Sequence, residues 1–181
     1  AVLKVAGRLN KTQYGPAVEV EVQEDGEVIE KCGDQDCRRS IYILQRRSTP
    51  LTMLQTFDAP QLSPNCLKRG ESTVSSQALQ LWNSEMLRDN AQYFAGRVMD
   101  TVGEEQIEKQ VERVYLAALS RYPTQEERVA GIERITGLTG KWGGHFDEKV
   151  PQGPKEARAR WEALATFCHV ILNSAEMIFI D

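Results

Sequence analysis

Near its start the chain alternates between apolar and acidic residues and does not follow a helical period. Residues 17–22 and 26–31 both alternate in this way, and the pair Asp25-Gly26 lies where they meet. Asp-Gly tolerates the positive φ angles of tight hairpin turns. The pattern therefore predicts a β-hairpin whose acidic side chains face solvent. Residues 41–44 are rich in β-branched and aromatic side chains and predict one further strand.

From residue 50 onward the apolar residues recur with the period of an α-helix. A short helix capped by Ser48 or Thr49, with Pro50 near its first turn, is expected to end at Asp58-Ala59-Pro60. Asn83-Ser84 is expected to divide the next apolar stripe between two helices, because both side chains compete for backbone hydrogen bonds. The residues of that stripe recur at helical spacings: Leu79, Trp82, Met86, Phe94 and Val98.

Two more helices and a loop are predicted further along the chain. The apolar stripe over residues 105–119 predicts a helix that Arg121-Tyr122-Pro123 ends. Thr124 and Glu127 have the spacing of a capping box, in which each side chain accepts a hydrogen bond from the other residue's backbone N–H, so the next helix should begin there. Residues 137–154 are rich in glycine and are expected to form a loop.

A last helix is predicted over residues 155–172, with Trp161, Leu164, Cys168 and Ile171 on its inner face. The fold class that follows is mainly α, a helical bundle-like domain with a small N-terminal β-hairpin and one further strand. We divide the chain into the β-hairpin segment, residues 1–37, and a mainly helical domain, residues 38–181, which we expect to be one compact unit. No apolar run approaches the roughly 18 residues of a membrane span.

The charged residues are unevenly distributed. The net charge of the chain is −4 at pH 7. Residues 38–70 are positively charged, in contrast to the chain as a whole. They carry six basic side chains and one acid, Asp58, which gives a local net charge of +5. A protein that binds nucleic acid in general usually has a basic domain with a pI above about 9. We therefore expect no nucleic-acid partner.

Arginines flank the predicted strand and offer two interpretations. Arg39 and Arg47 would share one face of the strand while Arg46 points away. Planar guanidinium groups suit sulfate, phosphate or carboxylate, so these arginines with Asp58 could bind an anionic glycan. In the alternative interpretation, they pair with Asp58 and with the C-termini of helices, and thereby tie the strand to the helical part of the chain.

Four cysteines are present, Cys32, Cys37, Cys66 and Cys168. The loop from Cys32 to Cys37 is short enough to close as a disulfide, and the sequence gives no pairing for the other two. A zinc site with Cys32 and Cys37 at one corner, and Cys66, Cys168 or His169 at another, is the alternative. Structural zinc sites usually show two tightly spaced pairs, so we predict the disulfide and no metal site.

Few residues suggest catalysis or small-molecule binding. His145 lies in the predicted glycine-rich loop with Trp142 and Phe146, and we regard Trp142 and His145 as candidate ligand-binding residues. Trp82 and Trp161 fall on apolar stripes and are expected in the core, and His169 is expected to be structural. The sequence contains no zinc-protease motif, phosphate-binding loop, serine-hydrolase elbow or dinucleotide fingerprint. We therefore expect no cofactor and assign no catalytic residue.

Several short motifs in the same order resemble one protein family. They are Gly7-Arg8-Leu9-Asn10, Arg38-Arg39-Ser40, Phe57-Asp58-Ala59-Pro60, Thr73-Val74-Ser75-Ser76-Gln77-Ala78-Leu79, Leu119-Ser120-Arg121-Tyr122-Pro123 and Leu172-Asn173-Ser174-Ala175-Glu176-Met177. Together they resemble the C-terminal domain of large secreted planctomycete proteins, known as domain of unknown function DUF1553. In that family the domain usually follows another unknown domain, and often a cytochrome-c-like module whose Cys-x-x-Cys-His motif is absent here.

The resemblance implies an extracytoplasmic location, secreted, periplasmic or at the cell surface, where disulfides form. We accordingly expect the chain to be the C-terminal piece of a longer protein whose export signal lies upstream. Our first hypothesis is a non-catalytic accessory or interaction domain linked to polysaccharide handling, and we do not expect this piece alone to be an enzyme. Its expected partners are the upstream domains of the same polypeptide and an anionic polysaccharide. Alternatives are a fragment of a hydrolase acting on an anionic glycan, or a docking module for a neighbouring cytochrome-like domain.

Overall fold

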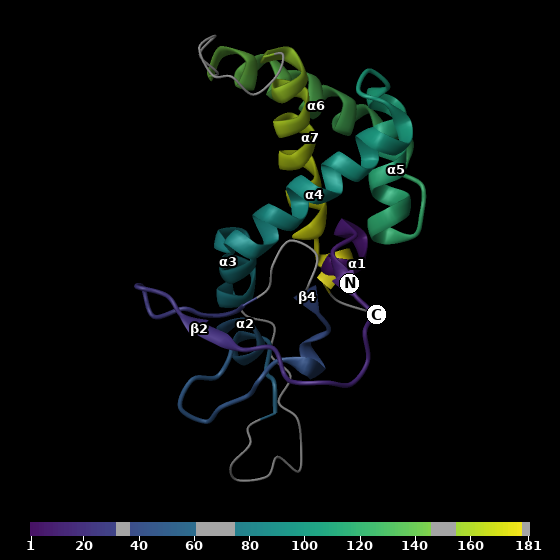
Figure 1. Cartoon of the computed structure of the whole chain (residues 1–181). Coiled ribbons are helices and arrows are strands. Elements are labelled where there is room, and N and C mark those ends of the chain that lie inside the picture. Colours follow the sequence, from purple (N-terminus) through teal and green to yellow (C-terminus); the bar gives the residue numbers. More distant parts are fainter. Residues whose placement is uncertain (32–36, 61–74, 146–154, 179–181) are drawn as a thin grey trace. The chain divides into compact units, whose positions relative to one another are not determined.

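The structure is a computed structural model that describes residues 1–31, 37–60, 75–145 and 155–178. Its described residues form eight α-helices and two small two-stranded sheets, so the predicted mainly α class is confirmed (Figure 1). The contacts within the chain define two compact units. One comprises Arg8–Ser84, and the other comprises Ala1–Gly7 together with Glu85–Asp181. We call them the small unit and the helical unit.

The predicted β-hairpin forms in the small unit. Strands β2 (Val20–Val22) and β3 (Val28–Glu30) pair antiparallel, with Val20 opposite Glu30 and Val22 opposite Val28. The connecting turn closes through the N–H of Gln23, which donates to the carbonyl of Glu27 at 2.7 Å. Gly26 has a φ of 87° there, which is the conformation that the Asp-Gly pair was expected to supply.

The strand predicted over residues 41–44 is wrong. That stretch begins in a 3-10 helix, η1 (Ser40–Tyr42), and only an isolated parallel bridge joins Ile43 to Val18. The strand in this part of the chain is instead β4 (Cys37–Arg38), which pairs parallel with β1 (Leu9–Asn10). A run of β-branched residues forms a strand only where a neighbour can pair along it, and here the pairing continues for a single bridge.

The small unit also contains the helices α2 (Thr52–Thr56) and α3 (Ser75–Asn83) among its described residues. The backbone N–H of Val28 donates to the Thr52 hydroxyl at 2.8 Å, and the buried Gln77 donates to the carbonyl of Thr56 at 3.1 Å. The Gln80 amide donates to the Glu27 carboxylate at 2.6 Å. These side chains link the hairpin to α2 and α3.

The described residues of the helical unit form six helices. Their bounds are α1 (Val2–Ala6), α4 (Glu85–Val102), α5 (Ile107–Leu119), α6 (Gln125–His145), α7 (Lys155–Leu172) and α8 (Ala175–Ile178). The predicted helices over 105–119 and 155–172 are therefore confirmed, and α3 ends and α4 begins on either side of Ser84, as the Asn83-Ser84 pair predicted. None of the helices in the described ranges is long and apolar enough to cross a bilayer.

Helix α7 packs against both α4 and α6 and is the centre of the helical unit, with α5 packed on all three and α1 on α4 (Figure 1). Its buried positions Leu164, Cys168 and Leu172 repeat every four residues and face this core. The other large buried side chains come from α4, α5 and α6: Leu87, Phe94, Val98, Val111, Val114 and Ile135. Burying such a side chain stabilises the folded state by about 1.5–3 kcal/mol.

Two expectations about the helical stripes are wrong. The glycine-rich loop predicted from residue 137 is helical as far as His145, because α6 continues through its glycines alongside α7; the rest of that loop lies outside the described residues. Trp82 was expected in the core, but its side chain is 53% exposed on α3. Periodicity places Trp82 on the apolar face of the helix, but it does not show which part of that face other elements bury.

The two compact units have other bounds than the division at residue 37 that the sequence suggested. The small unit contains the hairpin together with η1, α2 and α3, since the hairpin's hydrogen bonds run to Thr52 and Gln80. That residues 1–37 form a separate segment stays a prediction.

Candidate functional site

Arg38, at the end of β4, donates hydrogen bonds to three backbone carbonyls of one turn. Its Nη1 donates to the carbonyl of Pro16 at 2.9 Å, and its Nη2 donates to those of Thr12 at 3.1 Å and Tyr14 at 2.6 Å. The guanidinium carbon also lies 4.0 Å from the ring centroid of Tyr42, within cation–π range. Arg38 therefore fixes residues 12–16, which we call the Arg38 turn.

The Arg38 turn has an unusual backbone. Tyr14 has a φ of 64° and is followed by Gly15 at 86°, so two successive residues are left-handed. At the start of the turn, the N–H of Thr12 donates to the side-chain oxygen of Asn10 at 2.8 Å. The Tyr14 side chain is 80% exposed. The turn thus holds an aromatic ring in solvent on a backbone that a bulky residue rarely adopts.

The segments 11–18 and 38–47 lie side by side. The N–H of Val18 donates to the carbonyl of Tyr42 at 2.8 Å, and the N–H of Leu44 donates to the carbonyl of Val18, also at 2.8 Å. Together the two segments contain five basic side chains, Lys11, Arg38, Arg39, Arg46 and Arg47, and no acidic one. We call them the cationic strip.

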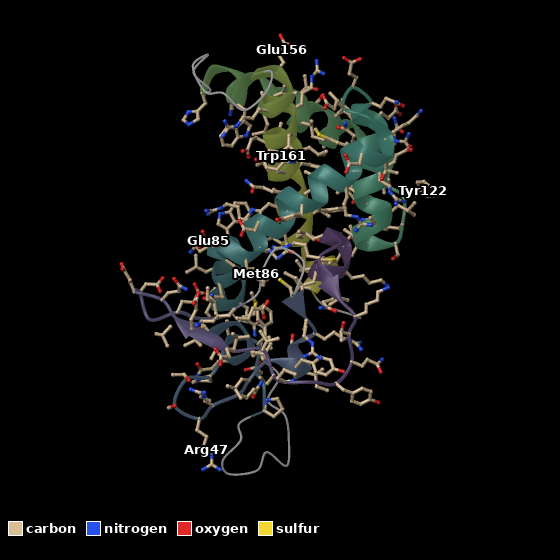
Figure 2. The ribbon with its side chains drawn as sticks, in the orientation of Figure 1. Arg47, Glu85, Met86, Tyr122, Glu156 and Trp161 are labelled. Carbon is tan, nitrogen blue, oxygen red and sulfur yellow. The ribbon has the colours of Figure 1, made fainter. Side chains whose placement is uncertain are left out.

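Three of the predicted site residues, Arg39, Arg46 and Arg47, lie on the cationic strip. All three side chains are exposed, and Figure 2 shows Arg47 reaching outward from the ribbon. Asp58 lies just after α2, half-buried, with a left-handed φ of 54°. Within the described residues no ion pair joins Asp58 to any of the three arginines.

The other two predicted site residues, Trp142 and His145, lie close together. They occupy the last turn of α6, and their rings meet edge to face with centroids 5.7 Å apart. Trp142 is half-buried and His145 is exposed. They belong to the helical unit, whereas the arginines and Asp58 belong to the small unit. The predicted site residues thus form two groups, one on each unit.

A polar cluster around Arg121 in the helical unit contains a contact that the sequence did not predict. Arg121 donates from Nη1 and Nη2 to the two carboxylate oxygens of Glu127, each at 2.8 Å. It also donates from Nε and Nη2 to Glu176, at 2.6 and 2.8 Å. Arg121 was interpreted only as the end of a helix, because a contact with Glu176, 55 residues away, leaves no local signal in the sequence.

The predicted capping box is confirmed within the same cluster. The N–H of Thr124 donates to the Glu127 carboxylate at 2.8 Å, and the N–H of Glu127 donates to the Thr124 hydroxyl at 3.2 Å. The hydrogen bonds from Arg121 and Thr124 lower the pKa of Glu127 to about 2. The same cluster raises the pKa of Arg121. These groups tie the end of α5, the start of α6 and α8 together, which is a structural role.

Of the two cysteines in the predicted disulfide, the structure describes only Cys37. Cys37 is buried and disulfide-bonded, but Cys32 and Cys66 lie outside the described residues, so its pairing with Cys32 stays a prediction. Cys168 is a fully buried thiol whose pKa is raised by burial. Burial, and after it the positive charge of Arg88, lowers the pKa of His169. In the parts of the chain that the structure covers, no three His, Cys, Asp or Glu side chains are grouped as metal ligands would be.

Comparison with known proteins identifies a family. The model of a family described as PSD1, protein of unknown function (DUF1553), matches residues 1–134. The match spans the small unit, α1, α4, α5 and the start of α6, and leaves out the closing motif that begins at Leu172. No curated protein and no solved structure matches the chain.

Proposed function

We propose that this chain, which belongs to the DUF1553 (PSD1) family of proteins of unknown function, is a non-catalytic interaction domain that binds an anionic polysaccharide. The small unit makes this contact through Arg39, Arg46 and Arg47. The parent is a secreted or cell-surface multidomain protein of the planctomycete type, and its upstream domains are the second partner.

The observation that carries this proposal is that one arginine of the cationic strip is held by the fold while three others are exposed. Arg38 is held by three carbonyls and an aromatic ring, whereas Arg39, Arg46 and Arg47 are exposed on the same acid-free strip. Three exposed cationic side chains on the same segment as a fixed fourth suit an anionic ligand. Guanidinium groups bind carboxylate, sulfate and phosphate through paired N–H donors, which favours an anionic ligand.

Energetic considerations favour a polymer over a small anion. An exposed ion pair contributes only about 0.2–1 kcal/mol, because water and salt screen it. Three such contacts to a separate small anion would give an affinity weaker than about 1 mM. A chain that repeats its charge can contact all three arginines at once and can exchange contacts along its length, which strengthens the combined binding.

The test compares the affinity of the whole chain for heparin, a sulfated polysaccharide, and for polygalacturonate, a carboxylated one, at low and at physiological salt. The variant replaces Arg39, Arg46 and Arg47 by Gln together. A matched control replaces Lys109, Arg134 and Lys141, three exposed cations of the helical unit, by Gln. Both variants therefore lose the same charge.

We expect the chain to bind at least one of the two polymers, with an affinity that falls as salt rises. The arginine variant should bind about tenfold more weakly or worse, while the control variant keeps most of its affinity. Neutral dextran should not bind. Equal losses in the two variants would mean that net charge alone attracts the polymer, and no binding by the parent chain would overturn the proposal.

A further inference from the structure

We infer that Tyr14 is the residue on which a sugar ring of the bound polysaccharide stacks, and that Arg38 is the positioning residue that holds it there. This inference rests on the proposed function and names the side chain that gives the cationic strip its preference for sugar. Tyr14 is not among the residues that the sequence pointed to.

The conformation and the exposure of Tyr14 are the starting point. A bulky residue at a φ of 64° is a genuine outlier, and such strain persists only where surrounding contacts enforce it. Arg38 supplies that enforcement through its bonds to the carbonyls of Thr12, Tyr14 and Pro16. The ring gains nothing from burial in return, since it is 80% exposed. Because the strained backbone of Tyr14 brings no burial of its ring, we infer that the ring serves to contact a ligand.

The surroundings of Tyr14 identify the ligand. The N–H of Val18 donates to the carbonyl of Tyr42, and the N–H of Leu44 donates to the carbonyl of Val18. These bonds pair the end of the segment that contains the Arg38 turn with the segment that carries Arg39, Arg46 and Arg47. Lys11 precedes the turn and is also exposed. An exposed aromatic ring on a strip that carries five basic side chains and no acidic one suits a sugar that presents C–H groups on its face and carboxylate or sulfate groups at its rim.

A fixed aromatic side chain also lowers the entropic cost of binding. Tyr has two side-chain torsions, so ordering it against a ligand costs little, and the Arg38 turn has already fixed the backbone. Single-stranded nucleic acid is another polymer with charges and flat rings, but its binding sites usually combine several aromatic residues with an extended basic groove.

The experiment measures the affinity of three Tyr14 variants for whichever of heparin and polygalacturonate the parent binds. Tyr14→Ala removes the ring, Tyr14→Phe keeps it without the hydroxyl, and Tyr14→Gly removes it while suiting the left-handed backbone. Tyr122→Ala is the matched control, because Tyr122 is a 65% exposed tyrosine of the helical unit (labelled in Figure 2). Circular dichroism confirms that each variant is folded.

We expect Tyr14→Ala and Tyr14→Gly to bind about three- to tenfold more weakly, as loss of one aromatic stacking contact predicts. Tyr14→Phe and Tyr122→Ala should stay within about twofold of the parent, since stacking needs the ring and not the hydroxyl. An unchanged affinity in Tyr14→Gly overturns the inference.

The failure of this inference and that of the proposed function give different results. Binding that depends on the three arginines but not on Tyr14 leaves the proposed function standing and removes the stacking role. A parent that binds neither polymer overturns both. The chain could instead bind single-stranded poly(dT) more tightly than either polysaccharide, with the same loss of affinity in Tyr14→Gly. That result would show that a nucleobase stacks on Tyr14, and it would overturn the inference that a sugar does.

Discussion

The Nη2 of Arg38 donates a hydrogen bond of 2.6 Å to the backbone carbonyl of Tyr14, a residue 24 positions earlier in the chain. Together with the bonds from Arg38 to Thr12 and Pro16 and the backbone bonds of Val18, this contact joins the two segments of the cationic strip, and it is made at the residue whose backbone is left-handed. It also explains why one arginine of the strip is structural while its neighbours are exposed. The binding role proposed for the small unit depends on this relationship.

Replacing Tyr14 by Gly should leave the protein as stable as before or more so. Relief of a left-handed backbone strain of about 1–2 kcal/mol is offset in part by the extra freedom of glycine in the unfolded chain, about 0.4–1 kcal/mol. We expect the free energy of unfolding to rise by about 0–1 kcal/mol in urea titrations. A loss of more than about 1 kcal/mol would mean that the ring itself stabilises the fold.

Two glycines of α6 should respond in opposite directions to alanine. A Cβ at Gly131 would lie 3.0 Å from Cγ1 of Val111 and 3.3 Å from Cζ of Phe167, whereas a Cβ at Gly140 would meet nothing within 4 Å. We expect Gly140→Ala to stabilise the helix by about 0.5–1 kcal/mol. Gly131→Ala should destabilise by about 1–3 kcal/mol, because the crowded core must shift.

Differential scanning calorimetry of the two glycine variants checks this prediction. Both replace a helical glycine of α6 by the same residue, so each serves as the control for the other. Stabilisation by Gly131→Ala would show that α5 and α7 separate easily from α6 and that the close approach at Gly131 is not needed.

The Glu127 carboxylate should contribute to stability at neutral pH and lose that contribution in acid. Its pKa in the folded protein is lowered to about 2 from the ordinary value of 4.5, mainly by the hydrogen bonds from Arg121. A lowered folded-state pKa stabilises above the unfolded-state value and ceases to do so as the pH falls through the folded one. The stabilisation should therefore disappear between about pH 5 and about pH 2.

Glu127→Gln tests this pH dependence, because it removes the charge and keeps the shape. We expect the variant to be about 1 kcal/mol less stable than the parent near pH 7, allowing for solvent screening of a partly exposed side chain. The difference should shrink toward zero near pH 2 in urea titrations. If the difference in stability between the variant and the parent stays constant with pH, the charge of Glu127 is not the source of the stabilisation by its contact with Arg121.

Thr124→Ala should weaken the start of α6 without changing the fold. The Thr124 hydroxyl accepts from the N–H of Glu127 at 3.2 Å, and loss of such a cap costs about 0.5–2 kcal/mol. Urea denaturation measures the cost, and Thr124→Ser, which keeps the hydroxyl, is the control. An unchanged denaturation midpoint in Thr124→Ala would contradict the role of this cap.

Features governed by local chemistry were predictable from the sequence. The capping box of Thr124 and Glu127 needs four residues, and the Asp25-Gly26 turn needs two, so both patterns contain the interaction they predict. The division at Asn83-Ser84 was equally local. The apolar repeat of α7 placed Leu164 and Cys168 correctly in the core, since periodicity reports which face is buried.

Features that depend on contacts between residues far apart in the sequence were not predictable in this way. Four glycines between residues 137 and 144 suggested a loop, because each costs about 1 kcal/mol relative to Ala in a helix interior, but packing of α6 on α7 outweighs that cost. The segment 41–44 has strand-forming residues but little to pair with. The Arg38 turn and the Arg121 cluster depend on partners 24 and 55 residues away, which no local pattern encodes.

The measurement that tests the central claim most directly is a titration of the isotope-labelled chain, followed by backbone amide chemical shifts, with short oligosaccharides of whichever of heparin and polygalacturonate the chain binds. We expect the largest shifts at residues 11–18 and 38–47, including Tyr14 and Arg39, with little change along α4 to α7. Shifts confined to the helical unit, or to the end of α6 around Trp142 and His145, would contradict a binding site on the cationic strip.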